Sequence, residues 1–388
     1  MKDTIISNAI KYIGVDDKEI DLFEGQYIVP NGFSYNSYLI KDEKIAVLDT
    51  VDRRKSDEWF NNLITELDGK EPDYLVVLHM EPDHSYNVGA LAQKYPNMKI
   101  VGNAKTFEYM QQFFEISNLE ERKVIVTEAT ELCLGEHTLQ FFMAPMVHWP
   151  EVMVAYEKTE KIVFAADGFG KFGTLDTEED WTCEARRYYF NIVGKYGAQV
   201  QALLKKLSTL DVKMICPLHG PILKENLEFY IDKYDIWSKY EPEDDGVFIV
   251  YASVYGNTKE AMEELAEILR EKGAKKVAIS DLTKEDFAEA IEDAFRYDKI
   301  VFAAPTYNAG LFPVMEHLLR ELSEKNYQNK KIGLVENGTW APMAAKKMKE
   351  IIATMKNMTV CDNVVTIKSK LSKDSRKQMK ELVNEILG

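Results

Sequence analysis

Four side chains that can bind metal ions crowd into the six residues from His79 to His84. They follow the apolar run Tyr74–Leu78, which is too short for a globular helix and is typical of a buried strand. A strand delivers the residues after its end to the rim of a sheet, where a rigid backbone holds them in place. The candidate ligands are His79, Glu81, Asp83 and His84. Imidazoles and carboxylates at such a rim predict metal-dependent chemistry.

Three further candidates stand at the ends of other strand-like runs: His148, Asp167 and His219. Taken singly, each is as compatible with a turn or loop residue as with a ligand. Together with the first four they supply four imidazoles and three carboxylates, which is too many for one tetrahedral zinc ion. Two ions that share a bridging carboxylate would use all seven, and the carboxylate-rich mixture favours iron or manganese. We expect the remaining histidines, His137 and His317, to be structural or solvated.

The composition limits the classes of function that need to be considered. A chain of 388 residues is long enough for two domains, and its formal charge of −16 argues against binding to nucleic acid or to an anionic membrane. The sequence has no apolar run of the roughly 20 residues that span a bilayer, and no secretion signal is visible. Four cysteines without a Cys-x-x-Cys pair indicate a reducing cytoplasm and exclude a rubredoxin-type or ferredoxin-type iron centre within this chain.

A short acidic linker, Tyr240–Gly246, predicts domains at residues 1–245 and 246–388. Strand-like runs dominate the first: Ser37–Ile40, Ile45–Asp49, Tyr74–Leu78, Lys99–Val101, Val124–Thr127, Leu139–Met143, Val152–Glu157, Ile162–Ala166 and Lys213–Cys216. Its expected helices are Asp57–Leu67, Gly89–Lys94, Lys105–Phe114 and a long one from Glu184 through Leu207. This mixture predicts two β-layers covered by helices.

The second domain alternates regularly between short apolar runs and amphipathic helices. The expected strands are Val247–Ala252, Val277–Ile279, Ile300–Ala304, Ile332–Val335 and Val364–Ile367. The expected helices are Lys259–Lys272, Lys284–Phe295, Val314–Glu324, Met343–Met355 and Asp374–Leu387. Continuous apolar strands between helices predict a doubly wound parallel sheet with a ligand at the carboxyl ends of its strands.

Three loops after these strands carry residues suited to a phosphorylated planar ligand. The first opens a helix, whose N-terminal N–H groups favour a phosphate, although an ordinary helix start capped by Asn257 or Thr258 is the alternative. The loop is neither a Walker loop nor a dinucleotide fingerprint. Tyr307 and Trp340 in the other two loops could sandwich a ring, or could simply pack at the edge of the sheet. The candidate residues are Ser253, Val254, Tyr255, Gly256, Asn257 and Thr258; Pro305, Thr306, Tyr307, Asn308, Ala309 and Gly310; and Glu336, Asn337, Gly338, Thr339 and Trp340.

The pattern His-x-Glu-x-Asp-His resembles the metallo-β-lactamase motif His-x-His-x-Asp-His, with Glu81 in place of the second histidine. The second half resembles flavodoxin. Together with Gly32–Ile40 and His148-Trp-Pro, these features make essentially the whole chain similar to the flavodiiron proteins, or A-type flavoproteins. The resemblance implies an N-terminal metallo-β-lactamase-like αββα sandwich followed by a flavodoxin-like, doubly wound, five-stranded parallel sheet.

The resemblance also implies cofactors and roles. His79, Glu81 and His148 would bind the iron nearer the flavin, Asp83, His84 and His219 would bind the other iron, and Asp167 would bridge the two. FMN would place its phosphate at the first loop and its ring at the other two. These seven ligands would then serve an FMN- and diiron-dependent reductase that converts dioxygen to water, nitric oxide to nitrous oxide, or both, and so detoxifies these gases in an anaerobe.

The same resemblance implies a cytoplasmic head-to-tail homodimer, or a dimer of dimers, that receives electrons from outside the chain. Rubredoxin is the leading donor, with a reduced deazaflavin as the alternative. Two other functions stay open at this point. One is a zinc hydrolase of the lactamase fold with an accessory flavodoxin-like domain, and the other is an electron carrier in which only the flavin works.

Overall fold

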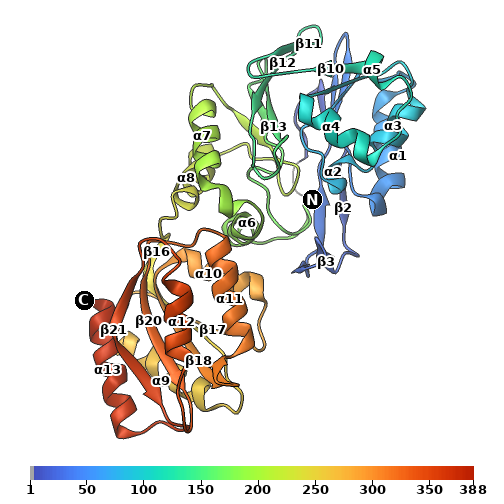
Figure 1. Cartoon of the computed structure of the whole chain (residues 1–388). Helices are drawn as coiled ribbons and strands as arrows, with labels where there is room; N and C mark the ends of the chain where they lie inside the picture. Colours follow the sequence, from blue (N-terminus) through green and yellow to red (C-terminus); the bar gives the residue numbers. More distant parts are fainter. Residues whose placement is uncertain (1–3) are drawn as a thin grey trace. The chain divides into compact units, whose positions relative to one another are not determined.

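The computed structural model describes residues 4–388, which divide into two compact units. Unit 1 contains the described part of Met1–Tyr189 together with Ala198–Asp235, and unit 2 contains Phe190–Gly197 together with Ile236–Gly388. The chain therefore enters unit 2 twice. In Figure 1 the elements of unit 2 after β16 are coloured yellow to red.

Two β-sheets form the centre of unit 1 (Figure 1). The first sheet has the order β1 (Ile10–Tyr12), β6 (Tyr38–Lys41), β7 (Ile45–Leu48), β8 (Tyr74–Val76), β9 (Lys99–Gly102) and β10 (Lys123–Ile125). The second has the order β11 (Glu131–Cys133), β12 (Thr138–Met143), β13 (Met153–Glu157), β14 (Ile162–Phe164) and β15 (Met214–Cys216). The two β-layers are confirmed.

Helices cover the outer faces of both sheets (Figure 1). Beside the first sheet lie α1 (Ser56–Leu67), α3 (Val88–Lys94), α4 (Ala104–Phe113) and α5 (Leu119–Arg122). On the side of the second sheet lie α7 (Gly197–Leu207) and α8 (Leu227–Ser238). Unit 1 is thus the predicted αββα sandwich.

Parallel pairing brings the ends of several strands of unit 1 to common edges. β7 pairs parallel with β8, and β14 pairs parallel with β15. Every residue of β7 and β14 is buried, as expected for central strands that pack on both faces. Because the carboxyl ends of parallel strands meet at one edge of a sheet, the residues that follow them can converge.

Some elements of unit 1 differ from the prediction. Pro82–Ser85 forms the short helix α2, so the segment from His79 to His84 is not entirely a loop. Two small antiparallel two-stranded sheets, β2 (Val15–Asp17) with β5 (Phe33–Tyr35) and β3 (Leu22–Phe23) with β4 (Tyr27–Ile28), were not expected, nor were β1, β11 and α8. Strands of two or three residues are too short to show a periodic pattern.

The long helix expected from Glu184 through Leu207 is wrong, because the structure breaks it. Helix α6 (Trp181–Tyr188) passes into a π-helical turn at Tyr189–Val193 and a 3₁₀ turn at Gly194–Tyr196 before α7 begins. At Gly197 an added Cβ would lie 2.3 Å from the carbonyl oxygen of Ser238. The close approach of these two backbone segments accounts for the glycine.

The sheet of unit 2 has the order β17 (Val277–Asp281), β16 (Asp244–Tyr251), β18 (Tyr297–Tyr307), β20 (Lys331–Asn337) and β21 (Thr359–Ile367). These five strands are parallel, as predicted, and the short β19 (Gly310–Leu311) adds an antiparallel partner at the end of β18. This is the flavodoxin-like order, in which a ligand binds where the chain reverses its winding, at the carboxyl ends of β16 and β18.

Helices cover both faces of this sheet. α9 (Asn257–Glu271) and α13 (Lys373–Leu387) contact each other on one face, while α11 (Pro313–Glu324) contacts both α10 (Phe287–Arg296) and α12 (Ala344–Ile352) on the other (Figure 1). α13 starts with a capping box in which the side chains of Ser372 and Ser375 each accept a backbone N–H. Among the described residues, no helix combines the length and the apolar character that spanning a bilayer requires.

Candidate functional site

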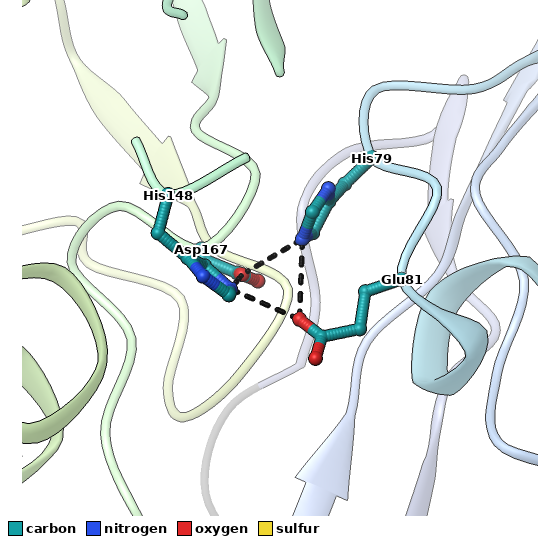
Figure 2. A group of neighbouring side chains, drawn as sticks. All are labelled: His79, Glu81, His148 and Asp167. Carbon is teal, nitrogen blue, oxygen red and sulfur yellow. Dashed lines mark hydrogen bonds and ion pairs between the residues drawn. The ribbon is translucent and has the colours of Figure 1, made fainter. Parts of the chain in front are cut away.

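The structure brings the seven predicted ligands together in two buried groups. The potential ligand atoms within each group lie within 4.8 Å of one another. The first group is His79, Glu81, His148 and Asp167, drawn in Figure 2. The second group is Asp83, His84 and His219. Since the seven residues come from both sheets, the two groups lie where the strand ends of the αββα sandwich meet.

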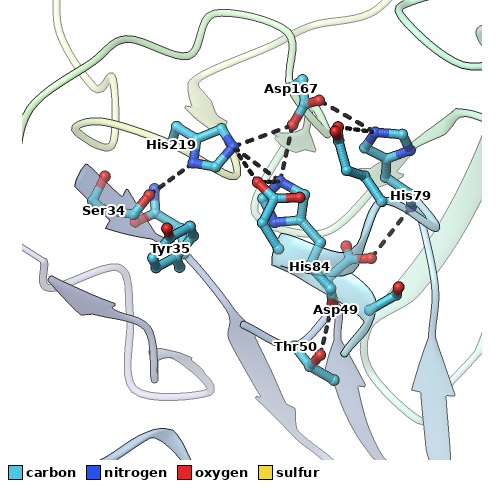
Figure 3. A network of polar contacts seen from close by, with 12 residues as sticks. Ser34, Tyr35, Asp49, Thr50, His79, His84, Asp167 and His219 are labelled. Carbon is cyan, nitrogen blue, oxygen red and sulfur yellow. Dashed lines mark hydrogen bonds and ion pairs between the residues drawn. The ribbon is translucent and has the colours of Figure 1, made fainter. Parts of the chain in front are cut away.

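Asp167, which follows β14, stands between the two groups (Figure 3). Its Oδ2 atom lies 3.4 Å from Nε2 of His79 and 3.1 Å from Nε2 of His148. Its Oδ1 atom lies 3.1 Å from Nε2 of His84 and 3.6 Å from Nε2 of His219. One oxygen therefore faces each group, which is the arrangement that a carboxylate bridging two metal ions requires.

The other two carboxylates each serve one group. Oε2 of Glu81 lies 2.9 Å from Nε2 of His148 and 3.3 Å from Nε2 of His79. Oδ2 of Asp83 lies 3.3 Å from Nε2 of both His84 and His219. Each group thus pairs two imidazole nitrogens with a carboxylate of its own.

Several of these oxygens lack the partners that burial normally demands. Both carboxylate oxygens of Asp83 and both of Asp167 are buried and accept no hydrogen bond from the residues that the structure describes. Burying an unpaired carboxylate is costly unless a cation compensates. A donor set of four imidazoles and three carboxylates, with four oxygens lacking hydrogen-bond donors, fits a pair of iron ions.

The groups hold one another in charged forms. Burial by itself would raise the pKa of Asp167, but His79, His148 and His84 lower it well below its ordinary value. Burial would likewise raise the pKa of Glu81, but His148 and His79 lower it. Burial would lower the pKa of His148, but Asp167 and Glu81 raise it to about 9. The carboxylates are therefore kept ionised, the form that binds a metal.

Two residues just after β7, Asp49 and Thr50, hold the ligand segment in place, and neither was predicted as a site residue. Asp49 Oδ1 accepts the backbone N–H groups of Leu78 at 2.8 Å and His79 at 3.3 Å. The Thr50 hydroxyl donates to the carbonyl oxygen of His84 at 2.7 Å (Figure 3). Burial raises the pKa of Asp49 to about 8. The sequence signal that could have found Asp49 and Thr50 is the apolar run Ile45–Leu48. Both residues follow it directly and so lie at the same sheet edge as His79.

Aromatic rings and a backbone carbonyl orient His219, which follows β15. Its ring stacks on Phe33 with centroids 4.2 Å apart, and its Nδ1 donates to the carbonyl oxygen of Ser34 at 2.7 Å. Phe172 and Tyr188, both buried, pack beside Phe33. This packing leaves Nε2 of His219 directed at the second group and keeps the surrounding space apolar.

The two remaining histidines lie outside both groups. His137 is buried and places Nδ1 2.9 Å from Oδ2 of Asp42 and Nε2 3.2 Å from Oε1 of Glu160. His317 is exposed on α11 and stacks on the ring of Phe287. Both positions agree with the prediction of structural or solvated histidines.

Unit 2 contains a cavity of about 560 Å³ at the carboxyl ends of its strands. It is lined by Ser253, Val254, Tyr255, Asn257, Thr258, Pro305, Thr306, Tyr307, Asn308, Ala309, Asn337, Gly338, Thr339, Trp340, Ala341 and Ser369. Three predicted residues, Gly256, Gly310 and Glu336, do not line it. Ala341 and Ser369 do, although they were not predicted. Ser369 follows β21, so the position of the fifth strand was the signal that could have found it.

Glu336 shows why a residue at the right edge can face away from the ligand. Its Oε2 accepts the backbone N–H of Ala345 in the first turn of α12 at 3.0 Å, and its Oε1 accepts the hydroxyl of Thr366 at 3.0 Å. A carboxylate at a helix N-terminus is stabilised by the helix dipole. The side chain thus caps α12 and does not reach the cavity.

The first loop has the form of an anion-binding turn. Ser253 Oγ accepts the backbone N–H groups of Gly256 and Lys259, and Gly256 caps α9 with φ 92°. The N-terminal N–H groups of a helix favour a phosphate. Tyr255 and Trp340 stand at the rim with exposed fractions of 92% and 90%, so they do not pack against the sheet edge.

Comparison with known proteins agrees with both units. Residues 33–220 match the model of the ODP family beta lactamase, and residues 248–384 match that of a flavodoxin domain. An uncharacterised protein of Methanocaldococcus jannaschii is 33% identical over 374 residues, which covers 94% of this chain and 92% of that protein. The anaerobic nitric oxide reductase flavorubredoxin of Vibrio vulnificus is 29% identical, covering 86% of this chain and 70% of that protein.

A solved structure shows the same arrangement of elements. The rubredoxin oxygen:oxidoreductase of Desulfovibrio gigas has a TM-score of 0.90 and 26% identity, covering 99% of this chain and 97% of that one. A lactamase-like unit with a two-group ligand set, followed by a flavodoxin unit, defines a flavoprotein with a binuclear metal centre. The chain belongs to the flavodiiron protein family.

Proposed function

We propose that this protein reduces dioxygen to water, nitric oxide to nitrous oxide, or both, with an FMN in unit 2 and two irons in unit 1. The observation that carries the proposal is the carboxylate of Asp167, which turns one oxygen to each ligand group. Among its relatives, one is named a nitric oxide reductase and another an oxygen oxidoreductase. Membership of the family makes the protein an oxidoreductase that contains flavin and iron.

The residues divide between the two irons as the groups divide. His79, Glu81 and His148 would hold one iron, Asp83, His84 and His219 would hold the other, and Asp167 would bridge them. When bound, the iron pair and the flavin supply electrons and open coordination positions for a diatomic gas. The FMN phosphate would lie at 253–258 and its ring between the loops at 305–310 and 337–341.

The protein contributes geometry and a dry setting. The buried carboxylates stay ionised and already face their imidazoles, so metal binding requires the imidazoles to release protons but needs little movement of the side chains. Phe33, Phe172 and Tyr188 are buried beside His219 and exclude water from that side. Exclusion of water favours an uncharged diatomic substrate and strengthens the electrostatic interactions within the site.

Electrons would come from a separate donor. Dioxygen reduction to water takes four electrons, and a diiron pair with a reduced flavin can hold that number. Rubredoxin is our leading donor, since the Desulfovibrio gigas relative is named for it, and a reduced deazaflavin is the alternative. We place the protein in the cytoplasm of an anaerobe, which agrees with its four free cysteines.

We further propose a head-to-tail homodimer, or a dimer of two such dimers, in which the flavin of one chain serves the irons of another. The exposed aromatics Tyr255 and Trp340 line the same cavity and support an interface there, because a contiguous exposed apolar patch marks an interaction site.

The test is an anaerobic stopped-flow experiment on purified protein whose metal and flavin have first been counted. Two irons and one FMN per chain, with rapid reoxidation by either gas, is the expected result and identifies the preferred substrate. Two zinc ions, or slow reoxidation by both gases, would overturn it and leave the zinc hydrolase. That alternative is not favoured, because Glu81 replaces the second histidine of the hydrolase motif.

A further inference from the structure

His79 is the one ligand in the two groups for which the described residues provide a carboxylate partner on the side away from the metal groups. Its Nδ1 lies 2.8 Å from Oε1 of Glu151, and neither side chain is exposed to solvent. Glu151 follows the His148-Trp-Pro segment and lies 72 residues from His79 in sequence. A carboxylate at Nδ1 keeps the proton on that nitrogen and leaves Nε2 free for a metal.

The position of Glu151 is itself fixed by other contacts. The backbone N–H of Met80 donates to the same Oε1 atom at 2.8 Å, and the side-chain amide of Asn103 donates to the Glu151 carbonyl oxygen at 2.5 Å. The other carboxylate oxygen, Oε2, is buried and has no hydrogen-bond partner among the described residues. The carboxylate is therefore rigid, and its hydrogen-bond donors engage only one of its two oxygens.

In the part of the chain that the structure describes, the second group has no equivalent of Glu151. Nδ1 of His219 donates to the carbonyl oxygen of Ser34, which is a neutral acceptor. Nδ1 of His84 is buried and makes no hydrogen bond within the described part of the chain. A charged acceptor raises the basicity of the imidazole it holds more than a neutral one does. The two metal positions thus differ in the residues behind their ligands, although their ligands are alike in type.

We propose that Glu151 is a positioning residue that makes the two iron positions unequal: it orients His79 and places a negative charge behind one iron only. The iron held by His79, Glu81 and His148 is then the more tightly bound and the first to be oxidised. This inference rests on the proposed diiron function. It follows because a more basic imidazole and a nearby negative charge both favour the ferric state.

Two substitutions separate orientation from charge. Glu151→Gln keeps an oxygen that can accept the Nδ1 proton but removes the charge, whereas Glu151→Ala removes both. Glu157 in β13 is the matched control, because it is equally buried and, among the described residues, its oxygens accept hydrogen bonds only from the backbone N–H groups of Thr159 and Glu160. Glu157→Gln and Glu157→Ala therefore report the cost of altering a buried glutamate without touching a ligand.

The first measurement is iron binding in the full-length protein, with folding checked by circular dichroism and by FMN content. Iron per chain and the rate of release to a chelator are determined for each variant. We expect Glu151→Ala to bind one iron roughly 10–100-fold more weakly, and Glu151→Gln to keep both. Two irons with unchanged release rates in Glu151→Ala would overturn the proposal, as would equal losses in the Glu157 variants.

The second measurement follows oxidation by Mössbauer spectroscopy of protein loaded with ⁵⁷Fe. Ferricyanide removes one electron from a ferrous ion, giving a ferric ion and ferrocyanide, and is added until half of the iron is ferric. The ferric signal should belong mainly to the iron that Glu151→Ala loses, and Glu151→Gln should reduce this preference. Equal oxidation of both irons, or first oxidation of the iron that Glu151→Ala retains, would overturn the assignment.

These outcomes remain distinct from failure of the proposed function. If the wild-type protein does not hold two irons, the diiron proposal itself fails. If the wild-type protein holds two irons but Glu151→Ala leaves iron release and oxidation order unchanged, only the role of Glu151 fails. Where Glu151→Ala does not fold, the oxidation order of Glu151→Gln against wild type still decides.

Discussion

Asp167 links the two ligand groups through the two oxygens of one side chain, which makes it the most informative residue to change. Glu81 and Asp83 each face one group, so losing either leaves the other group complete. Losing a charge at Asp167 affects both groups at once.

Asp167→Asn should lower the iron content and reduce turnover with either gas by roughly 100-fold or more, while FMN stays bound in unit 2. An amide has one carbonyl oxygen and no negative charge, so it cannot serve both irons equally. Iron analysis, the flavin absorption spectrum and stopped-flow rates check this. Asp211→Asn is the control, because that carboxylate is exposed and pairs with Lys161. Retained turnover with two irons per chain would contradict the bridging role.

The ligands that could be predicted share one property: each lies within a few residues of the end of an apolar run, so the local sequence marks it. Asp49 also follows an apolar run, but the roles of Asp49 and Glu151 were not predictable, because the residue each supports lies far away in sequence, 30 positions for Asp49 and 72 for Glu151. Such partnerships depend on how the strands pair, which no local pattern records. Glu336 was predicted to contact the ligand because it lies at the correct edge of the sheet. Its position did not reveal that its side chain caps α12.

At the scale of elements, three turns of unit 1 are held together by His137. It lies between β11 and β12 and contacts Asp42, between β6 and β7, and Glu160, between β13 and β14. Burial would raise the pKa of Asp42, but hydrogen bonds from His137 lower it to about 2. Burial would lower the pKa of His137, but Asp42 and Glu160 raise it above its ordinary value.

This contact should make stability depend on pH. The lowered pKa of Asp42 stabilises the fold above pH 3.8 and loses its effect as the pH falls towards 2. The raised pKa of His137 stabilises it below pH 6.5 and loses its effect as the pH rises through the folded value. His137→Asn should therefore lower the free energy of unfolding by about 1 kcal/mol, mainly between pH 3.8 and pH 6.5.

Urea unfolding across the pH range measures this difference. His317→Asn is the control, since His317 is exposed and stacks on Phe287. A difference between wild type and His137→Asn that does not change with pH would show that charge on His137 contributes nothing.

Helix α9 offers a second comparison, because a glycine with φ near 90° stands at each end. Gly256 caps its start beside the cavity of unit 2, and Gly273 follows its end, with open space around both. Alanine at either position would add about 1–2 kcal/mol of backbone strain. Both variants should melt at lower temperature, but only Gly256→Ala should weaken FMN binding, roughly tenfold. Flavin fluorescence titration measures this, and equal affinity of both variants would remove the first loop from the phosphate site.

The regular elements of unit 2 were predictable because each buried strand is a continuous apolar run and each helix has one apolar face. The break between α6 and α7 was not, because the apolar residues continue with helical spacing through Tyr189–Val193. The residues around the break pack against distant segments, Phe190 on Phe295 and Gly197 against the backbone at Ser238, and contacts so far away in sequence leave no periodic trace. Tertiary packing overrides helical propensity here.

At the scale of the whole molecule, the proposed head-to-tail dimer predicts complementation between two inactive proteins. Asp167→Asn should lack a working metal centre, and Ser253→Asp should lack FMN because it puts a carboxylate at the phosphate site. After the two are dissociated and reassociated together, mixed dimers would pair one intact flavin with one intact metal centre. Activity should return to roughly a quarter of wild type.

Native mass spectrometry confirms that subunits have exchanged, and each variant reassociated with itself is the control. A mixture that stays inactive although mixed dimers are present would mean that the flavin and irons of a single chain work together. That outcome would leave the reductase proposal intact and remove only the head-to-tail arrangement.

We retain residues 245 and 246 as the proposed boundary between the two sequence domains, but the compact units do not follow that boundary throughout. Phe190 is buried and stacks on Phe295 with centroids 4.1 Å apart, and the Asn191 amide donates to the carbonyl oxygen of Ala288. A short segment from the middle of the first sequence domain is therefore part of the second unit.

This segment sets the order in which the protein can mature during its synthesis. A ribosome adds roughly 5–20 residues per second, so Phe295 is made roughly 5–20 seconds after Phe190. Over that interval the ring of Phe295, on which Phe190 stacks in the finished protein, does not yet exist, however complete the strands of unit 1 are. Premature termination after unit 1 would leave Phe190 permanently without that partner, and exposed apolar side chains in unfinished chains promote aggregation. The last stage of folding in the first half thus waits for translation of the second.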